Sequence, residues 1–298
     1  MRILVTGGTG LIGKHLIAKL CNEHCVTVLT RRVAEAEPLF AKSVTLISSL
    51  DDFNNLDDFD AIINLAGEPI VDKRWTDKQK QIICHSRWDI TEKISNLIAA
   101  SEKPPEVFIS GSAIGVYGRQ GEQEIDETFT DMHDEFSHQV CARWESIAMR
   151  AQIDQTRVCL LRTGVVLASK GGALAKMLLP FKLGVGGHVG SGKQYMSWIH
   201  IDDMVNGIVF LLDHSDCHGA FNLTAPKPVT SRQFSKALAK RLHRPCLFPV
   251  PGFVLKIALG EASDLLLYGQ NVVPNKLIEH GFTFSFPEID GAFEQLNL

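Results

Sequence analysis

The chain has 298 residues, of which 45% are hydrophobic and 21% charged, and its formal net charge is −4. This length can bury a large core in one domain with an attached lobe or in two domains. The slightly negative charge gives no sign of a nucleic-acid or anionic membrane partner. No basic segment followed by a long apolar run opens the chain, and no apolar stretch could span a bilayer, so we predict a cytoplasmic protein.

Residues 1–13 read MRILVTGGTGLIG, an apolar run followed by closely spaced glycines and then by an amphipathic helical pattern. This order predicts a strand, a glycine turn and a helix. Such a turn lets the backbone approach a pyrophosphate, and the N–H groups that open the helix then face the phosphates. The sequence therefore predicts a dinucleotide site with contacts from Gly7, Thr9, Gly10, Leu11, Ile12 and Gly13.

The second predicted strand, 26–29, ends in Thr30, Arg31 and Arg32. In a dinucleotide-binding fold, an acid after this strand binds the ribose 2′-hydroxyl of NAD, whereas arginine accommodates the 2′-phosphate of NADP. Here there is no acid, and the two arginines offer charge-assisted donors. The alternative is a pair of solvated surface arginines, but their position favours NADP(H) as the cofactor.

Further strands are predicted at 44–47, 61–67, 107–109, 158–161 and 220–223, with helices at 75–100 and 136–151 between them. This alternation predicts an α/β fold, a doubly wound parallel-sheet Rossmann domain with a smaller C-terminal α/β lobe. Small residues at the carboxyl ends of strands let a flat cofactor lie against the backbone. The strand ends add Leu65, Ala66, Gly67, Ser110 and Arg162 to the predicted cofactor contacts.

The second half of the chain divides into a glycine-rich segment and a proline-rich one. We predict an NADP-binding domain over 1–165, completed by about 198–225, and a lid or connector over 166–197. Residues 226–298 are predicted to form a substrate lobe. Asp202 or Asp203 is expected to cap a helix that starts near Met204.

The seven cysteines include no Cys-x-x-Cys pair, and the eleven histidines show no metal-ligand spacing. Small buried residues with free thiols are the expected state of such cysteines in a cytosolic protein. We predict no metal site.

Several segments resemble the extended short-chain dehydrogenase/reductase superfamily, the group of nucleotide-sugar epimerases. Residues 6–13 match its TGxxGxxG turn, and residues 64–67 its NxAG segment. Residues 112–118 resemble its serine-to-VYG stretch, and residues 198–203 its (F/W)xHxDD segment.

The chain is most similar to an atypical branch of that superfamily, the "epimerase family protein" group. The shared segments run along nearly the whole chain and include residues 86–87, 178–181, 186–192, 223–226 and 259–261. The resemblance implies a Rossmann domain, NADP(H) binding and a small C-terminal lobe. It also implies that Arg87 reaches the cofactor.

The resemblance fails where the superfamily places its catalytic Tyr-x-x-x-Lys pair. In those enzymes the tyrosine moves a proton, and the lysine lowers its pKa and binds the nicotinamide ribose. Alignment of Glu145 with the family's glutamate puts Ser137 at the tyrosine and Cys141 at the lysine, so only Ser112 of the triad is retained.

Tyr117, His138 and Tyr195 are possible substitute proton donors, although a structural role is the simpler interpretation for each. Two functions remain open. One is an NADP(H)-dependent, epimerase-like oxidoreductase that acts on an unknown small molecule through a non-standard proton donor. The other is a catalytically silent NADP(H)-binding sensor or regulatory protein. The sequence leaves the oligomeric state open.

Overall fold

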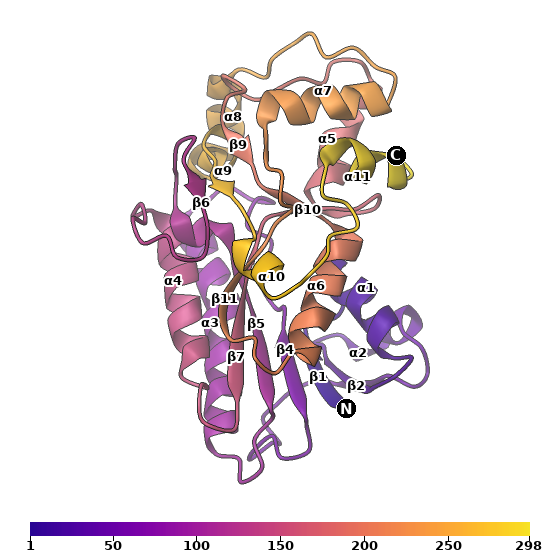
Figure 1. Cartoon of the computed structure of the whole chain (residues 1–298), viewed down its shortest axis with the longest axis vertical. Coiled ribbons are helices and arrows are strands. Elements are labelled where there is room, and N and C mark those ends of the chain that lie inside the picture. Colours follow the sequence, from indigo (N-terminus) through magenta and orange to yellow (C-terminus); the bar gives the residue numbers. More distant parts are fainter.

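The computed structural model describes residues 1–298 and is organised around a seven-stranded parallel sheet (Figure 1). The strand order is β11-β7-β5-β4-β1-β2-β3. The chain runs outward from β1 to β3 and then returns to β4 beside β1, which leaves a crevice at the carboxyl ends of β1 and β4. The predicted doubly wound Rossmann fold is confirmed. Its strands are β1 (Arg2–Thr6), β2 (Cys25–Leu29), β3 (Thr45–Ile47), β4 (Ala61–Asn64), β5 (Val107–Ala113), β7 (Arg157–Thr163) and β11 (Gly219–Leu223).

Helices cover both faces of this sheet. On one face, α1 (Leu11–Leu20) and α6 (Ile201–Asp213) pack onto a core of 27 buried residues. On the other face, α3 (Asp77–Ala99) and α4 (Phe136–Met149) enclose a core of 13 residues. Strands that are buried on both faces need apolar residues at every position, which explains the unbroken apolar runs in the sequence. Short helical turns, α2 (Val33–Ala36) and η1 (Glu37–Leu39), follow β2.

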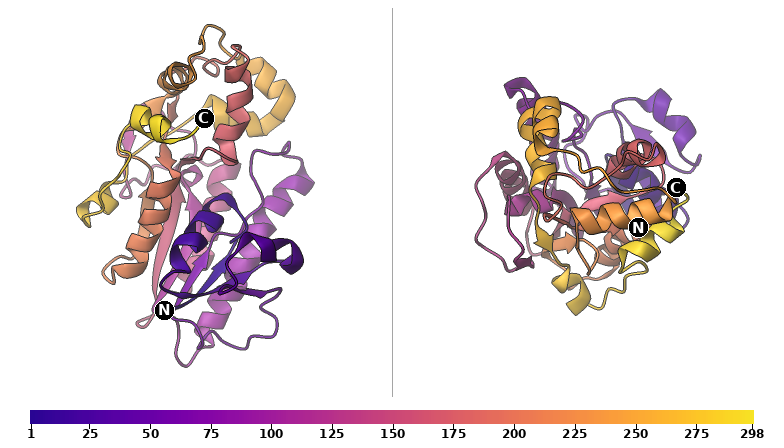
Figure 2. Two further views of the ribbon diagram at one scale, coloured as in Figure 1. Left: turned by 90° about the vertical axis from the view of Figure 1, so that its right-hand side faces the viewer. Right: turned by 90° about the horizontal axis from the view of Figure 1, so that it is seen from above.

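The smaller lobe stands over the carboxyl ends of the strands (Figure 2). Its own core of 13 buried residues joins α5 (Gly172–Lys182), α7 (Ser231–Arg241) and α11 (Ile289–Gln295) to the parallel pair β8 (Val165–Leu167) and β10 (Trp198–His200). The remaining elements are η2 (Ile114–Tyr117), β6 (Glu124–Ile125), β9 (Tyr195–Met196), β12 (Val229–Thr230), α8 (Gly252–Leu259), η3 (Gly260–Ser263), α9 (Asp264–Leu267), β13 (Asn271–Val272) and α10 (Asn275–Glu279). None of the helices has the length and apolar character needed to cross a membrane.

The predicted cap of α6 was wrong. The helix begins at Ile201, and the side chain of His200 accepts the capping hydrogen bond from the N–H of Asp202. The fully buried Asp203 carboxylate instead accepts hydrogen bonds from the N–H groups of Ser285 and Phe286, at 2.8 and 2.9 Å. This acid ties the C-terminal segment to the sheet domain, a role that depends on residues 82 and 83 positions away in the sequence.

Candidate functional site

A cleft of about 650 Å³ opens at the carboxyl ends of β1, β2 and β4, where the strand order reverses. It is formed by the turn between β1 and α1, the end of β2 with α2, the segment after β4, and one face of α3. Nine of the predicted cofactor residues line it: Gly7, Thr9, Gly10, Thr30, Arg31, Arg32, Leu65, Ala66 and Gly67.

The glycine turn has the close backbone packing that its sequence predicts. Gly7 has φ +69°, and a Cβ there would lie 2.4 Å from the carbonyl of Leu65. A Cβ on Gly13 would lie 2.5 Å from the carbonyl oxygen of Gly7, so helix and turn touch without room for a side chain. Gly10 is the N-cap of α1 and makes no side-chain cap, which leaves the first N–H groups of the helix free for an anion.

Two arginines at the end of β2 bring positive charge into the cleft lining, which also holds Glu35, Glu68 and Asp89. Arg31 is exposed and makes no ion pair, whereas Arg32 contacts Glu35 at 3.2 Å across an exposed pair. An exposed pair of this kind contributes little, roughly 0–1 kcal/mol, so Arg32 can exchange Glu35 for a phosphate at small cost. Both side chains line the cleft.

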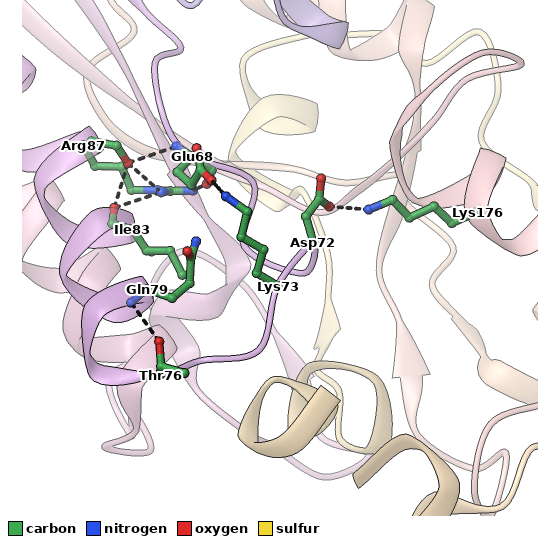
Figure 3. Close-up of polar contacts among 9 residues, drawn as sticks. Glu68, Asp72, Lys73, Thr76, Gln79, Ile83, Arg87 and Lys176 are labelled. Atoms are coloured by element: carbon green, nitrogen blue, oxygen red, sulfur yellow. Dashed lines mark hydrogen bonds and ion pairs between the residues drawn. The ribbon is translucent and has the colours of Figure 1, made fainter. Parts of the chain in front are cut away.

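The segment after β4 is held against α3 by Ser86 and by Arg87, whose contact with Glu68 is drawn in Figure 3. Ser86 Oγ accepts a hydrogen bond from the N–H of Glu68 at 2.9 Å, and Arg87 Nη2 donates to the Glu68 carbonyl at 2.9 Å. The Arg87 guanidinium also lies 5.4 Å over the ring of Trp144. Burial lowers the pKa of Arg87, but an arginine keeps its charge throughout the physiological range.

Arg87 is not part of the cleft wall. A Cβ on Gly67 would lie 3.0 Å from Arg87 Cζ, so the guanidinium sits directly behind that glycine. Its contact with a cofactor, implied by the family resemblance, stays a prediction.

Five other predicted cofactor residues also lie outside the cleft lining: Leu11, Ile12, Gly13, Ser110 and Arg162. Leu11 packs near Gly172, at the start of α5, where an added Cβ would be 2.8 Å from Leu11 Cδ2. Ser110 is fully buried in β5 and donates to the carbonyl of Gly111 at 3.4 Å.

Arg162 belongs to a buried polar network that crosses the strands. Ser112, Arg162 and Asn222 stand side by side on β5, β7 and β11. Ser112 Oγ donates to Glu145 Oε1 at 2.7 Å, and Arg162 binds both oxygens of that carboxylate at 3.0 and 2.9 Å. Arg162 Nη1 also donates to the hydroxyl of Tyr117, which in turn donates to Asn222 at 2.7 Å. Burial lowers the pKa of Arg162, but the bonds and charge of Glu145 outweigh this and shift it upward.

The two residues at the usual tyrosine and lysine positions lie on the buried face of α4. Ser137 is 2% exposed and donates to Glu135 Oε1 at 2.6 Å. Burial, reinforced by the nearby Glu145, raises the pKa of the Cys141 thiol to about 12, so this thiol is neutral at pH 7. Neither side chain can act as an activated proton donor in this arrangement.

Of the other possible donors, Tyr117 and His138 are also engaged in hydrogen bonds. Burial raises the pKa of Tyr117, whose hydroxyl is committed to Asn222 and Arg162. His138 bonds the carbonyl of Val116 through Nδ1, and Tyr195 lies in β9, paired with Thr230.

Comparison with known proteins identifies the family. Residues 3–224 match the NAD-dependent epimerase/dehydratase family. The chain belongs to this family. Residues 250–296 match a domain of unknown function, DUF1731. The chain is 38% identical to the epimerase family protein SH2119 of Staphylococcus haemolyticus, over 99% of this chain and 98% of that protein.

Among solved structures, human epimerase family protein SDR39U1, crystallised with NADPH, superposes with a TM-score of 0.92 and 33% identity, over 100% of both chains. The UDP-glucuronic acid 4-epimerase of Bacillus cereus, solved with UDP-glucuronic acid and NAD, has a TM-score of 0.77 but only 16% identity over 99% and 97% of the two chains. The second likeness shows a shared fold only. The matches to the Staphylococcus haemolyticus and human epimerase family proteins confirm the sequence resemblance to that branch.

The sequence interpretation missed much of the α3 and α2 contribution to the cleft. The α3 residues Ile82, His85, Ser86, Asp89 and Ile90 share one helical face, and their three- and four-residue spacing was a readable signal. Residues of the helical turn after β2 had no such signal, because its orientation depends on packing. The cleft lining missed from the sequence comprises Thr6, Leu29, Glu35, Ala36, Leu39, Glu68, Pro69, Ile82, His85, Ser86, Asp89 and Ile90.

Proposed function

We propose that this chain binds NADP(H) in the cleft between β1, β2 and β4. The main support is that Arg31 and Arg32 lie in the cleft wall and that no acid stands at the end of β2. In this geometry the pyrophosphate would lie on the glycine turn and the adenosine 2′-phosphate between the arginines. The NADPH in the crystal structure of the human relative supports this assignment.

On this basis the protein is an epimerase-like oxidoreductase of an unknown small molecule, with the lobe 226–298 as the substrate lobe. The cofactor, when bound, supplies or accepts hydride. Ser112, at the end of β5, would orient a substrate hydroxyl by accepting its hydrogen bond, and it would donate to a carbonyl oxygen only by giving up its hydrogen bond to Glu145. The proton would then come from water or the substrate, and loss of general acid help lowers rates by about 10²–10⁴-fold. A slow enzyme is the expected result.

A second function, a catalytically silent NADP(H) sensor, is favoured by one observation. The residues at the three usual catalytic positions, Ser112, Ser137 and Cys141, are at most 5% exposed, and both hydroxyls donate to glutamates. A sensor needs the cofactor cleft but no exposed proton relay.

Two measurements test these functions in turn. Titration calorimetry of the purified protein with NADPH tests the shared step, and absence of binding would exclude both. NADPH oxidation with a panel of carbonyl compounds then tests catalysis. An oxidoreductase should lose turnover on Ser112→Ala while keeping its NADPH affinity.

The double variant Ser137→Tyr with Cys141→Lys restores the usual pair at i and i+4 on α4. Its folding is checked by circular dichroism, because both sites are buried. If Ser112→Ala changes nothing and the folded double variant gains no carbonyl reductase activity, the sensor function stands. The cytoplasmic location remains a prediction.

A further inference from the structure

Helix α8 is almost wholly apolar, with the sequence GFVLKIAL, yet none of its residues is buried. Phe253 and Ile257 are 66% and 71% exposed, and they stand at i and i+4 on one face of the helix. Large apolar side chains gathered on an exposed surface commonly mark a binding site.

Helix α5 adds a second apolar pair to the same region. Leu179 and Leu183 are also spaced i and i+4, and they are 65% and 69% exposed. Val185, just after α5, and Leu247 and Phe248, shortly before α8, are large apolar residues that are exposed as well. These segments touch, because Gly190 donates to Val250 and Val250 donates to His188. We call Leu179, Leu183, Val185, Phe248, Phe253 and Ile257 the apolar wall.

The apolar wall adjoins the proposed cofactor site through a single loop, residues 66–76. The first part of this loop, Gly67 to Pro69, lines the cofactor cleft. Further along, Asp72 forms an ion pair with Lys176 of α5 (Figure 3). Arg74 Nη2 donates to the carbonyl of Ile257 in α8 at 3.0 Å. Both helices of the wall are therefore fastened to the loop that closes one side of the cleft.

The charges of this region are arranged differently from those of a diphosphate site. The loop's cations are engaged within the protein: Lys73 with Glu68 at 3.0 Å, and Arg74 with Ile257. Lys176 is paired with Asp72, which leaves Lys182 and Lys256 as the cations on α5 and α8 without an ion pair. On α5 and α8, the exposed apolar side chains form a larger surface than these two lysines do.

We propose that the apolar wall binds the body of a hydrophobic carbonyl substrate, rather than a nucleoside diphosphate sugar. This inference rests on the proposed NADP(H) function and names the substrate class of that site. The wall offers apolar area for an alkyl chain or ring of the substrate. Its continuity with the loop of the cofactor cleft is what favours a substrate over a second copy of the chain or a membrane surface.

The test uses straight-chain 2-ketones, from 2-pentanone to 2-octanone, titrated by calorimetry into the full chain saturated with NADP⁺, so that no hydride is available. Each added methylene should tighten binding by up to about fourfold, which corresponds to about 0.8 kcal/mol per buried methylene. UDP-glucuronic acid is titrated in parallel, and this arm measures whether Lys182 and Lys256 recruit a diphosphate.

A matched pair of variants tests whether the ketone binds to the apolar wall. Ile257→Asn should weaken 2-octanone binding at least tenfold and flatten the dependence on chain length. Ile278→Asn, which alters an exposed isoleucine on α10 instead, should leave ketone affinity unchanged. Both variants should keep the NADP⁺ affinity of the unmodified protein, because neither residue lines the cofactor cleft.

Several outcomes overturn the proposal. These are UDP-glucuronic acid binding with no ketone binding, or ketone affinity that is independent of chain length. A dimer in sedimentation that Ile257→Asn dissociates, without ketone binding, would assign the wall to a second copy. Co-sedimentation with phosphatidylglycerol vesicles, lost in Ile257→Asn and without ketone binding, would assign it to a membrane surface. If the unmodified protein does not bind NADP⁺, the proposed function itself is contradicted, and not only the substrate class.

Discussion

Ser112 donates a hydrogen bond of 2.7 Å to Glu145, whose carboxylate also accepts hydrogen bonds from Nε and Nη2 of Arg162. Ser112, the one retained position of the superfamily's catalytic triad, therefore belongs to a buried charged network. Since Glu145 accepts from an arginine and a serine together, removing any one partner changes the hydrogen bonding of the other two. This coupling links the stability of the fold to the candidate chemistry.

The cofactor preference should depend on the arginines after β2. We expect the unmodified protein to bind NADPH more tightly than NADH, because a charge-assisted hydrogen bond contributes about 1.5–3 kcal/mol, or roughly tenfold to a hundredfold in affinity. Changing Arg31 and Arg32 to Ala should erase most of this preference. Arg244→Ala, at an exposed arginine outside the cleft, is the control. Equal NADH and NADPH affinity of the unmodified protein in calorimetry would contradict the prediction.

Substitutions at two positions of the glycine turn should have different effects, one on cofactor binding and the other on the stability of the fold. Gly10 has extended backbone angles, and its added Cβ would meet only the Gly7 oxygen, at 3.1 Å. Gly10→Val should therefore leave the fold intact but block approach of a pyrophosphate. Gly13→Ala should lower the melting temperature, because its Cβ would clash at 2.5 Å with the Gly7 oxygen. Calorimetry and thermal unfolding check both variants, and normal NADPH binding by Gly10→Val would show that the phosphates lie elsewhere.

The Arg162–Glu145 pair should be a major stabilising contact. Both side chains are only 11% exposed, so removing one partner leaves a buried charge without compensation. We expect Arg162→Leu to reduce the free energy of unfolding by about 3–5 kcal/mol, as for other broken buried pairs. Arg150→Leu breaks an exposed pair with Glu92 and should cost less than about 1 kcal/mol. Equal effects of the two variants in urea unfolding would mean that the buried network contributes little.

Stability should fall in mild acid because of His200. This residue is 2% exposed, and burial lowers its pKa below 6.5, against the opposing charges of Asp202 and Asp203. The unfolded state therefore binds a proton more readily, so stability rises with pH near 6.5 and is lost as the pH falls below it. His200→Asn keeps a capping oxygen for α6 but cannot titrate. Its free energy of unfolding should vary less between pH 7.5 and 5.5, measured by urea unfolding, and an unchanged slope would remove His200 as the cause.

The sequence determined the sheet and the cofactor turn because both depend on local rules. Unbroken apolar runs predicted the parallel strands, and the confirmed positions of β1, β2, β4, β5, β7 and β11 follow from that patterning. The order of Gly7, Gly10 and Gly13 predicted a strand, a turn and a helix, since each glycine responds to a steric limit within a few residues. The end of β2 likewise placed Arg31 and Arg32 in the cleft.

Only the tertiary structure decided what the remaining polar residues do. Arg162, at the end of a strand in the sequence, turns to Glu145 on α4, and Asp203 turns to the backbone at Ser285 and Phe286. The exposure of α8 was equally hidden, because an apolar octapeptide looks the same whether it is buried or not. A buried polar group needs a hydrogen-bond partner, and an apolar helix stays exposed unless another segment packs against it. Those neighbours are set by packing between distant segments, which no local pattern specifies.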